Sequence, residues 1–152
     1  MVTVTDGYID VSDSSRNTRI GSNAGDSFSG TTTDNTLIGY DAGTAITSGD
    51  NNTVVGSYAG DAITTGGENT ALGKSALGNN TTASYNTAIG RESLLANTTG
   101  ASNVAVGYGA LDANTTADSN TAVGTDALGA NTTGAYNVSV GQASLLLNTT
   151  GA

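Results

Sequence analysis

Hydrophobic and polar positions recur along this chain with a period of seventeen residues. An Asn followed by Thr or Val, a variable residue, then Ile, Val or Leu, and finally Gly begins at Asn35 and returns every seventeen residues up to Asn137. An eighth copy begins at Asn17, one residue further back, so the first unit holds a single insertion. Seven copies in strict register predict a stack of equivalent structural units. We number the positions of the repeat from this Asn, which is position 1.

Alternation within each repeat predicts short β-strands. Positions 2 and 4, for example Thr87 and Ile89, have the same parity and therefore share one face of a strand. Positions 12 to 15, such as residues 97–100, predict a second short strand that enters a turn. A helix is disfavoured because Gly interrupts every repeat and a 3.6-residue period is not sustained. The predicted fold class is all-β: a parallel β-solenoid, or β-roll, of about eight coils of seventeen residues.

Three columns of residues are expected to build this solenoid. The Asn at position 1 is predicted to form a ladder of amide hydrogen bonds along the axis, from Asn35 through Asn52, Asn69, Asn86, Asn103 and Asn120 to Asn137. The Gly at position 5 is predicted at a corner, where a positive φ or a close backbone contact excludes a side chain. These glycines are Gly39, Gly56, Gly73, Gly90, Gly107, Gly124 and Gly141. The predicted core consists of Ile38, Val55, Leu72, Ile89, Val106, Val123 and Val140 at position 4, with Leu77, Leu94, Leu111, Leu128 and Leu145 at position 9.

Positions 9 and 12 vary together. The first three coils pair Gly at position 9 with a large apolar residue at position 12, as in Gly60 and Ile63, whereas the last five pair Leu with Asn, as in Leu94 and Asn97. Each coil therefore keeps one large apolar side chain at these two positions, although the position that supplies it changes. We infer that both positions face the same interior space, which must be filled once.

Two segments are predicted: residues 1–16, an N-terminal strand or cap outside the register, and residues 17–152, the solenoid with repeats starting at 17, 35, 52, 69, 86, 103, 120 and 137. Each coil offers few large apolar groups against the entropy of ordering seventeen residues. We therefore expect partners along the side of the rod, most simply in a parallel homotrimer. The Ala residues at position 3 are expected to face outward and to allow close approach of neighbouring chains. The open last coil suggests a piece of a longer fibre.

Composition narrows the classes of function. The chain has 152 residues, thirteen acids against four bases, a net charge of −9, and no His, Cys, Pro or Trp. It therefore cannot form a Ser-His-Asp triad, a Cys nucleophile, a Cys or His zinc site or a disulfide. Its charge repels nucleic acid, and no apolar run is long enough to span a bilayer. We expect no enzyme activity, no cofactor and no metal, since the acids are scattered among the turns, and no signal peptide is evident.

The tandem pattern N-T-A-[I/V]-G-x-x-A-L-x-x-N-T-T-G resembles the repeats of bacteriophage tail-fibre proteins over residues 17–152. Its N-[T/V]-A-[I/V]-G core is also similar to the head repeat of trimeric autotransporter adhesins, which form trimeric β-rolls. The resemblance implies a fibre that attaches to a host or surface, located on a virion or on the cell surface. It implies that the chain associates with itself, as a trimer or filament, and that it binds a cell-surface receptor or glycan.

Two further interpretations stay open. Tyr40, Tyr58 and Tyr108 follow the corner glycines and either pack at the corner or stack on sugars. Repeated Thr at position 2 and in the Thr pairs suggests an ice-binding solenoid. Parity argues against a flat Thr face there, because Thr87 shares its face with Ile89, which is expected in the core.

Overall fold

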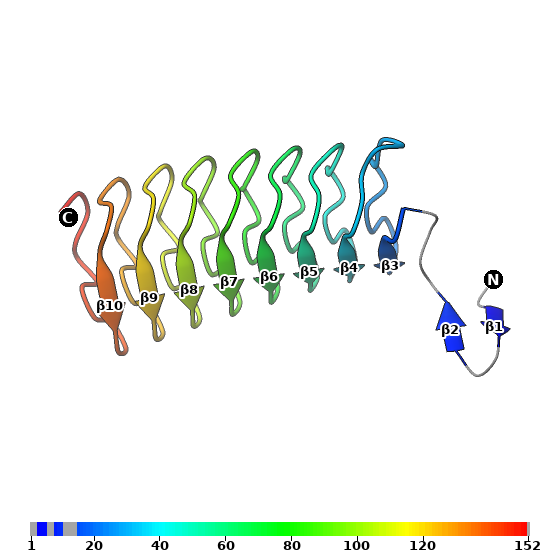
Figure 1. The fold of residues 1–152 in the computed structure, drawn as a ribbon. Coiled ribbons are helices and arrows are strands. Elements are labelled where there is room, and N and C mark those ends of the chain that lie inside the picture. Colours follow the sequence, from blue (N-terminus) through cyan, green and yellow to red (C-terminus); the bar gives the residue numbers. More distant parts are fainter. Residues whose placement is uncertain (1–2, 6–7, 11–14, 152) are drawn as a thin grey trace.

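The computed structural model describes residues 3–5, 8–10 and 15–151, and residues 17–151 wind into eight stacked coils (Figure 1). Each coil contributes one three-residue strand to a single parallel sheet, whose order runs from β3 to β10 without a crossover. This confirms the predicted parallel β-solenoid with coils of about seventeen residues. The strands of the sheet are β3 (Thr18–Ile20), β4 (Thr36–Ile38), β5 (Thr53–Val55), β6 (Thr70–Leu72), β7 (Thr87–Ile89), β8 (Val104–Val106), β9 (Thr121–Val123) and β10 (Val138–Val140).

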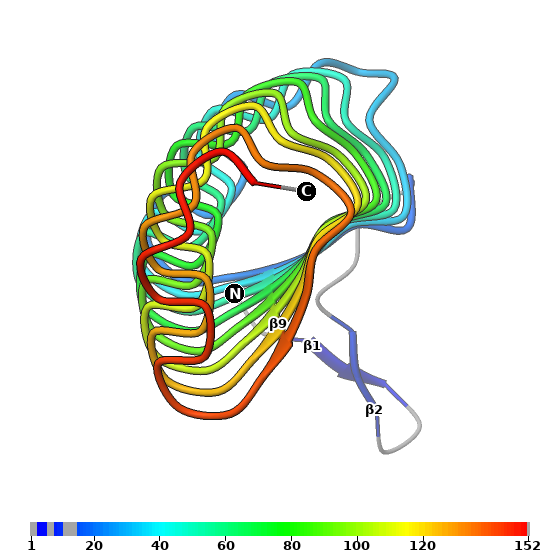
Figure 2. The same cartoon turned by 90° about the vertical axis from the view of Figure 1, so that its left-hand side faces the viewer.

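Equivalent positions of neighbouring coils lie opposite one another. Ala88 of β7 pairs with Ala105 of β8, and the same offset of seventeen relates all strands from β4 onward. Between β3 and β4 the offset is eighteen, as the insertion requires. Viewed along the axis, the coils superpose as one closed outline with the strands gathered on one wall (Figure 2). Residues at the same position of successive repeats therefore form a column of similar side chains along the rod.

The expected second strand at positions 12 to 15 is wrong. These residues form bends, although successive coils still hydrogen-bond there: the Thr98 amide donates to the Thr115 carbonyl at 2.9 Å, and the Thr98 hydroxyl donates to the same oxygen at 3.0 Å. The side-chain bond recurs along the Thr column at position 13. This wall is a polar ladder of turns rather than a sheet.

The N-terminal segment contains a hairpin. β1 (Thr3–Thr5) and β2 (Tyr8–Asp10) pair antiparallel, with Val4 opposite Ile9. Two short strands thus lie within the predicted N-terminal segment, and residues 1–2, 6–7 and 11–14 of that segment lie outside the described residues. The described hairpin pairs only with itself and adds no strand to the sheet beside β3. Its role as a cap stays a prediction.

The expected core at position 4 is wrong, because the parity of the strands is reversed. From β4 to β10 the side chains at position 3, such as Leu37, Val54 and Ala105, are buried, whereas those at position 4 point outward. Leu72 is 46% exposed and Val140 is 68% exposed. Ile38, Val55, Ile89, Val106 and Val123 are half-buried on the same outer wall. The Ala residues at position 3, expected to face other chains, are therefore interior residues.

The interior is only about one side chain thick, and this explains the reversal. Where position 9 is Gly, position 3 is large: a Cβ on Gly43 would lie 2.9 Å from Leu37 Cδ2 and 2.8 Å from Ile46 Cδ1. Where position 9 is Leu, as in Leu94, position 3 is Ala, or Ser in the last coil. The inferred exchange between positions 9 and 12 thus includes position 3 as well. An Ile or Val pointing inward opposite Leu would overfill this space.

The Leu residues at position 9 are buried as predicted, except in the last coil. Leu77, Leu94, Leu111 and Leu128 are fully buried, while Leu145 is 48% exposed because no further coil covers it in this structure. Each adopts a left-handed backbone, with φ of 51° at Leu94. That conformation costs about 1–2 kcal/mol for a residue with a Cβ, and burying a Leu side chain gains about 1.5–3 kcal/mol. Burial therefore outweighs the backbone strain.

The corner glycines combine positive φ with close backbone contact, as predicted. Gly90 has a φ of 132°, and a Cβ there would lie 2.4 Å from the carbonyl oxygen of Gly107 in the next coil. The same contact is present at every corner glycine from Gly21 to Gly124. Gly141 has a φ of 122°, but a Cβ there would meet only Ser144, at 3.9 Å.

This difference predicts that Gly90→Ala destabilises the fold far more than Gly141→Ala. Both variants bear the strain of positive φ, about 1–3 kcal/mol. Only Gly90→Ala must also push two coils apart, which we expect to add about 2 kcal/mol or more. Urea unfolding followed by far-UV circular dichroism measures both midpoints. Equal shifts of the urea midpoint in the two variants would show that the close approach of successive coils adds nothing to the destabilisation caused by Gly90→Ala.

Candidate interaction surface

A buried column of Asn side chains holds successive coils together. The backbone amide of Asn103 donates to Asn86 Oδ1 at 3.0 Å, and the Asn103 Nδ2 group donates to the Ala117 carbonyl at 2.8 Å. The first of these bonds recurs between neighbouring coils from Asn17 to Asn137, which confirms the predicted ladder. Asn35 to Asn120 are fully or almost fully buried, and Asn137 is half-buried. Buried amides with all partners in place fix the register of the stack.

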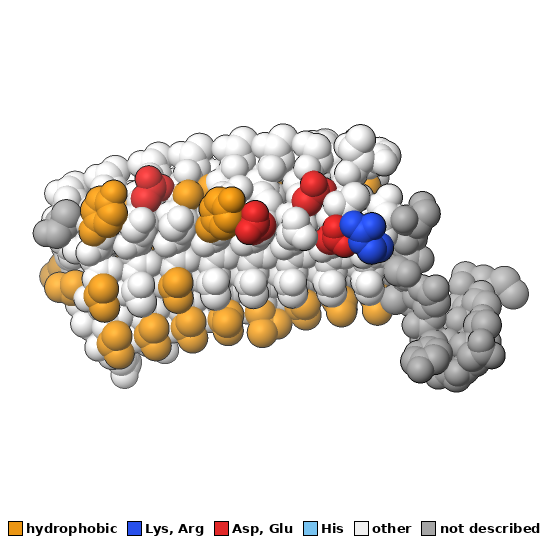
Figure 3. All heavy atoms as spheres, in the orientation of Figure 1, with side chains coloured by type: hydrophobic (Ala, Val, Ile, Leu, Met, Phe, Trp, Pro, Cys, Tyr) orange, Lys and Arg blue, Asp and Glu red, His pale blue; other side chains and the backbone are white. Residues whose placement is uncertain are grey.

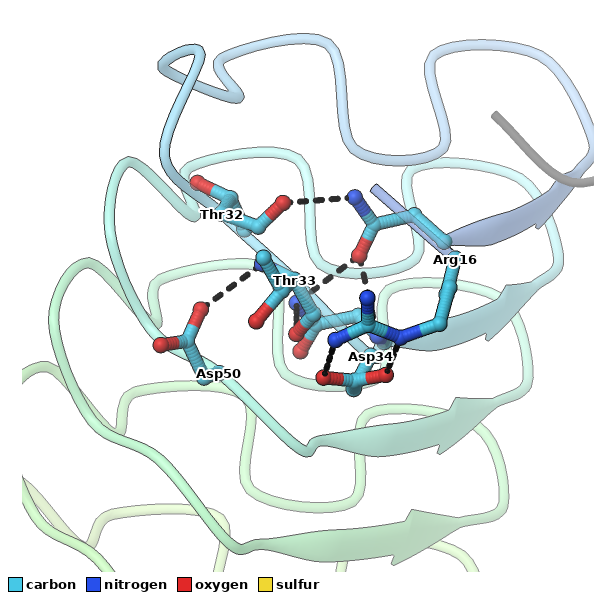
Figure 4. A network of polar contacts seen from close by, with 7 residues as sticks. Arg16, Thr32, Thr33, Asp34 and Asp50 are labelled. Carbon is cyan, nitrogen blue, oxygen red and sulfur yellow. Dashed lines mark hydrogen bonds and ion pairs between the residues drawn. The ribbon is translucent and has the colours of Figure 1, made fainter. Parts of the chain in front are cut away.

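The ladder begins beside an ion pair. Asn17 donates to the Thr32 carbonyl and accepts from Asn35, while the guanidinium of Arg16 binds both carboxylate oxygens of Asp34 at 2.6 and 2.7 Å (Figure 4). The pair raises the pKa of Arg16 and lowers that of Asp34, chiefly through the hydrogen bonds between them. Both side chains are exposed to a large degree, so their contribution to stability is small.

A second Asn ladder runs beside the first, since Asn86 Nδ2 and Asn97 Nδ2 both donate to the Gly100 carbonyl. Asn97 Nδ2 donates to Asn80 Oδ1 at 2.9 Å, and Asn114 Nδ2 donates to Asn97 Oδ1 at 2.8 Å. Asn131 and Asn148 continue it. The sequence shows these Asn residues at position 12 but indicates only that they replace an apolar residue. Their spacing of seventeen residues, the same as at position 1, is the signal that identifies a ladder.

The outer wall of the sheet carries no charged side chain in any of the eight coils. We call it the strand face: the side chains at positions 2 and 4 of β3 to β10. Position 4 carries only Ile, Val or Leu, and position 2 carries Thr in six coils and Val in two. Figure 3 shows this face as a continuous hydrophobic row beside a mostly polar row, with the charged groups in a separate row. With a strand spacing of about 4.8 Å, it is about 38 Å long.

The tyrosines after the corner glycines pack against neighbouring side chains at the corner, and their stacking on sugars stays a prediction. Tyr40 and Tyr58 pack edge to face, with ring centroids 5.4 Å apart. Arg91 lies over the ring of Tyr108, with Cζ 5.7 Å from its centroid. All three tyrosines nevertheless remain 41–49% exposed. Corner packing therefore leaves much of each ring open to solvent.

Neither a metal-binding cluster nor a pocket is found among the described residues. They contain no group of three or more acids that could hold a metal and form no pocket. In the same part of the chain, no helix is long and apolar enough to cross a membrane. These findings leave surfaces, rather than a cavity, as the candidates for function.

The chain matches no protein-family model, no curated protein and no solved structure. Its functional assignment therefore depends on the repeat, the fold and the chemistry of its surfaces.

Asp112 provides a pH-dependent test of the packing. Burial raises the pKa of its carboxyl, and the charges of Asp126 and Glu92 add to the rise. A carboxyl whose pKa is higher in the folded state than in the unfolded state stabilises the fold at pH values below the unfolded-state pKa, near 3.8. This stabilisation is lost as the pH rises through the folded-state pKa. We therefore expect Asp112→Asn to raise the free energy of unfolding by about 0.5 kcal/mol or less at pH 7, because solvent screens this half-buried group.

The advantage of Asp112→Asn should vanish near pH 3, where the wild-type carboxyl is protonated in both states. Urea midpoints at the two pH values measure it. Asp26→Asn is the matched control, since Asp26 occupies the same repeat position in the first coil and is exposed. A gain that is equal at both pH values would rule out desolvation as its cause.

Proposed function

We propose that this chain is a shaft segment of an attachment fibre, most simply a phage-type tail fibre, and that it acts by non-covalent contacts only. The observation that carries the proposal is the strand face, which stays uncharged along all eight coils of a chain with a net charge of −9. A fibre needs rigidity along its axis and a side that accepts neighbouring chains. The Asn ladders and the strand face supply these two properties.

The strand face is suited to a second copy of the same chain. Two highly acidic rods repel one another unless they meet through a surface without acids. The strand face is such a surface, and its Ile, Val and Leu side chains would lose contact with water on association. Three copies with their strand faces turned toward a common axis form the expected parallel homotrimer. This face replaces the position-3 Ala residues that the sequence suggested for the same role.

Native mass and a charge placed on the strand face test this association. We expect wild-type protein near three times 14.8 kDa and Val106→Lys near 14.8 kDa by light scattering. A Lys at position 106 points outward, so the coil should fold, but its charge would have to be desolvated at the interface. Thr99→Lys adds the same charge at an exposed position outside the strand face and should keep the wild-type mass.

A folded wild-type monomer would contradict self-association through this face. Unchanged mass in Val106→Lys would place the interface elsewhere on the rod. Large open-ended assemblies of the wild type would favour a filament-forming surface subunit over a closed trimer. A closed trimer would fit both the phage-type fibre and an adhesin head of the autotransporter type.

Ice binding is a second candidate, favoured by the reversed parity. Because position 4 faces outward, the Thr column at position 2 lies on the outer wall of the sheet instead of beside the core. This removes the objection drawn from Thr87 and Ile89. Regularly spaced Thr hydroxyl and methyl groups at about 4.8 Å intervals form the kind of ordered surface that ice recognition needs.

Thermal hysteresis separates the two candidates. A fibre shaft should show none in dilute solution, whereas an ice-binding face should show hysteresis that Thr87→Lys abolishes. Hysteresis in a monomeric wild-type sample would favour ice binding over the fibre.

A further inference from the structure

One corner of the solenoid gathers aromatic and cationic side chains in five consecutive coils. We call it the corner row: Tyr40, Tyr58, Lys74, Arg91 and Tyr108, each one or two residues after the corner glycine of its coil. The equivalent residues of the remaining coils are small or polar and uncharged at the first of these positions. At about 4.8 Å per coil, the row extends about 19 Å along the rod.

The backbone beneath the row is fixed by coil-to-coil hydrogen bonds. The Tyr58 amide donates to the Tyr40 carbonyl at 2.9 Å, the Glu92 amide to the Lys74 carbonyl at 3.0 Å, and the Asp126 amide to the Tyr108 carbonyl at 2.9 Å. The side chains are therefore spaced by the solenoid itself. Rigid spacing of this kind lowers the entropy cost of binding an extended ligand.

Charge is locally reversed at the centre of the row. Coils 4 and 5, residues 69–102, contain Lys74 and Arg91 against the single acid Glu92, a net charge of +1 in a chain of −9. The two preceding coils, residues 35–68, contain four acids and no base. An anion is thus repelled along most of the rod and attracted at these two coils.

Lys74 is the cation at this corner with the most freedom to bind. It is exposed, and its ammonium group has no ion-pair or hydrogen-bond partner among the residues that the structure describes. Arg91 uses Nε and Nη2 to bind Glu92, at 3.1 and 2.8 Å, which leaves Nη1 for another acceptor. The other acids near this corner belong to other coils: Asp41 and Asp126 lie in coils 2 and 7, and Asp61 and Asp112 lie in coils 3 and 6, which adjoin coils 4 and 5.

The rings at each side supply a different kind of contact. Tyr58 belongs to the coil before Lys74, and Tyr108 to the coil after Arg91, with 41% and 48% of their surfaces exposed. Tyr rings are rigid, amphipathic platforms whose faces pack against apolar surface while the hydroxyl stays hydrated. The apolar face of a sugar ring fits such a platform, and its hydroxyl groups remain in water.

We propose that the corner row binds an oligosaccharide carrying one anionic group, a carboxylate or a phosphate, between neutral sugars. The anionic group lies between Lys74 and Arg91, and the flanking sugars stack on Tyr58 and Tyr108. The site deepens the proposed attachment role and rests on it, since it gives the shaft a contact with surface glycans. A polyanion is disfavoured because its outer charges would meet the acids of the adjoining coils.

A pair of probes that differ by one charge tests the site. The first is a xylo-oligosaccharide bearing a single glucuronic acid, and the second is the same xylo-oligosaccharide without it. At low ionic strength, titration calorimetry should show tighter binding of the charged probe, and salt should remove the difference. Lys74→Gln should weaken binding of the charged probe by about fivefold and leave the neutral probe unchanged.

Aromatic variants test the stacking contacts. Tyr108→Ser should weaken both probes by about five- to tenfold. Tyr85→Ser is the matched control, because Tyr85 is 58% exposed at position 17, outside the row, and its loss should change neither probe. Equal binding of the two probes, no binding of the charged probe, or equal effects of the two Tyr variants would overturn the proposal.

The native mass of each variant separates this site from the fibre role. Loss of glycan binding with the assembly intact would concern the corner row alone. Glycan binding by a monomer would leave the row in place and contradict the self-associating shaft.

Discussion

Strict coil-on-coil register is the constraint on which the rest of this structure depends. The buried Asn side chain of one coil accepts the backbone amide of the equivalent Asn in the next, so a slip of one residue would leave both groups buried without partners. The corner glycines add a steric condition, because the backbones of successive coils lie too close there for a Cβ. Together these two columns explain why the repeat length stays at seventeen residues from Asn35 onward.

The thinness of the interior connects this register to the surface. In coils 4 to 7 one large side chain, the Leu at position 9, fills the space, and in coils 2 and 3 two apolar side chains, at positions 3 and 12, fill it. Other apolar residues of the repeat must then face outward, and position 4 does so along the whole sheet. An apolar outer wall is thus a consequence of a narrow core combined with a strand that ends at a glycine corner. The proposed association of chains uses this wall.

The sequence predicted the solenoid, its coil length, the Asn ladder and the corner glycines, because each produces a column of identical residues that a repeat makes visible. The sequence-based prediction was wrong about which side chains of each strand face the interior. Ile89 and Val106 look like core residues and Ala88 and Ala105 like spacers, and only the three-dimensional width of the interior shows the reverse. It failed again at positions 12 to 15, where Thr side chains bond to the next coil and the backbone bends.

The surfaces were predictable to a lesser degree. Tyr40, Tyr58 and Tyr108 were identified at the corners from their spacing. The edge-to-face packing of Tyr40 against Tyr58 and the position of Arg91 over Tyr108 depend on side-chain directions that a repeat pattern does not contain. The single net positive region of coils 4 and 5 could be counted from the sequence. Its place on the same corner as the exposed rings becomes apparent only once the coils are stacked.

Hydrogen exchange of the Asn side-chain amides tests the register most directly. The Nδ2 groups of Asn86, Asn103 and Asn120 are buried and bonded, whereas the side chain of Asn79 is exposed. In a nuclear magnetic resonance experiment on the intact chain, we expect the three buried groups to exchange with solvent orders of magnitude more slowly than Asn79. Exchange of all four at the same rate would contradict a solenoid held in register by its buried amides.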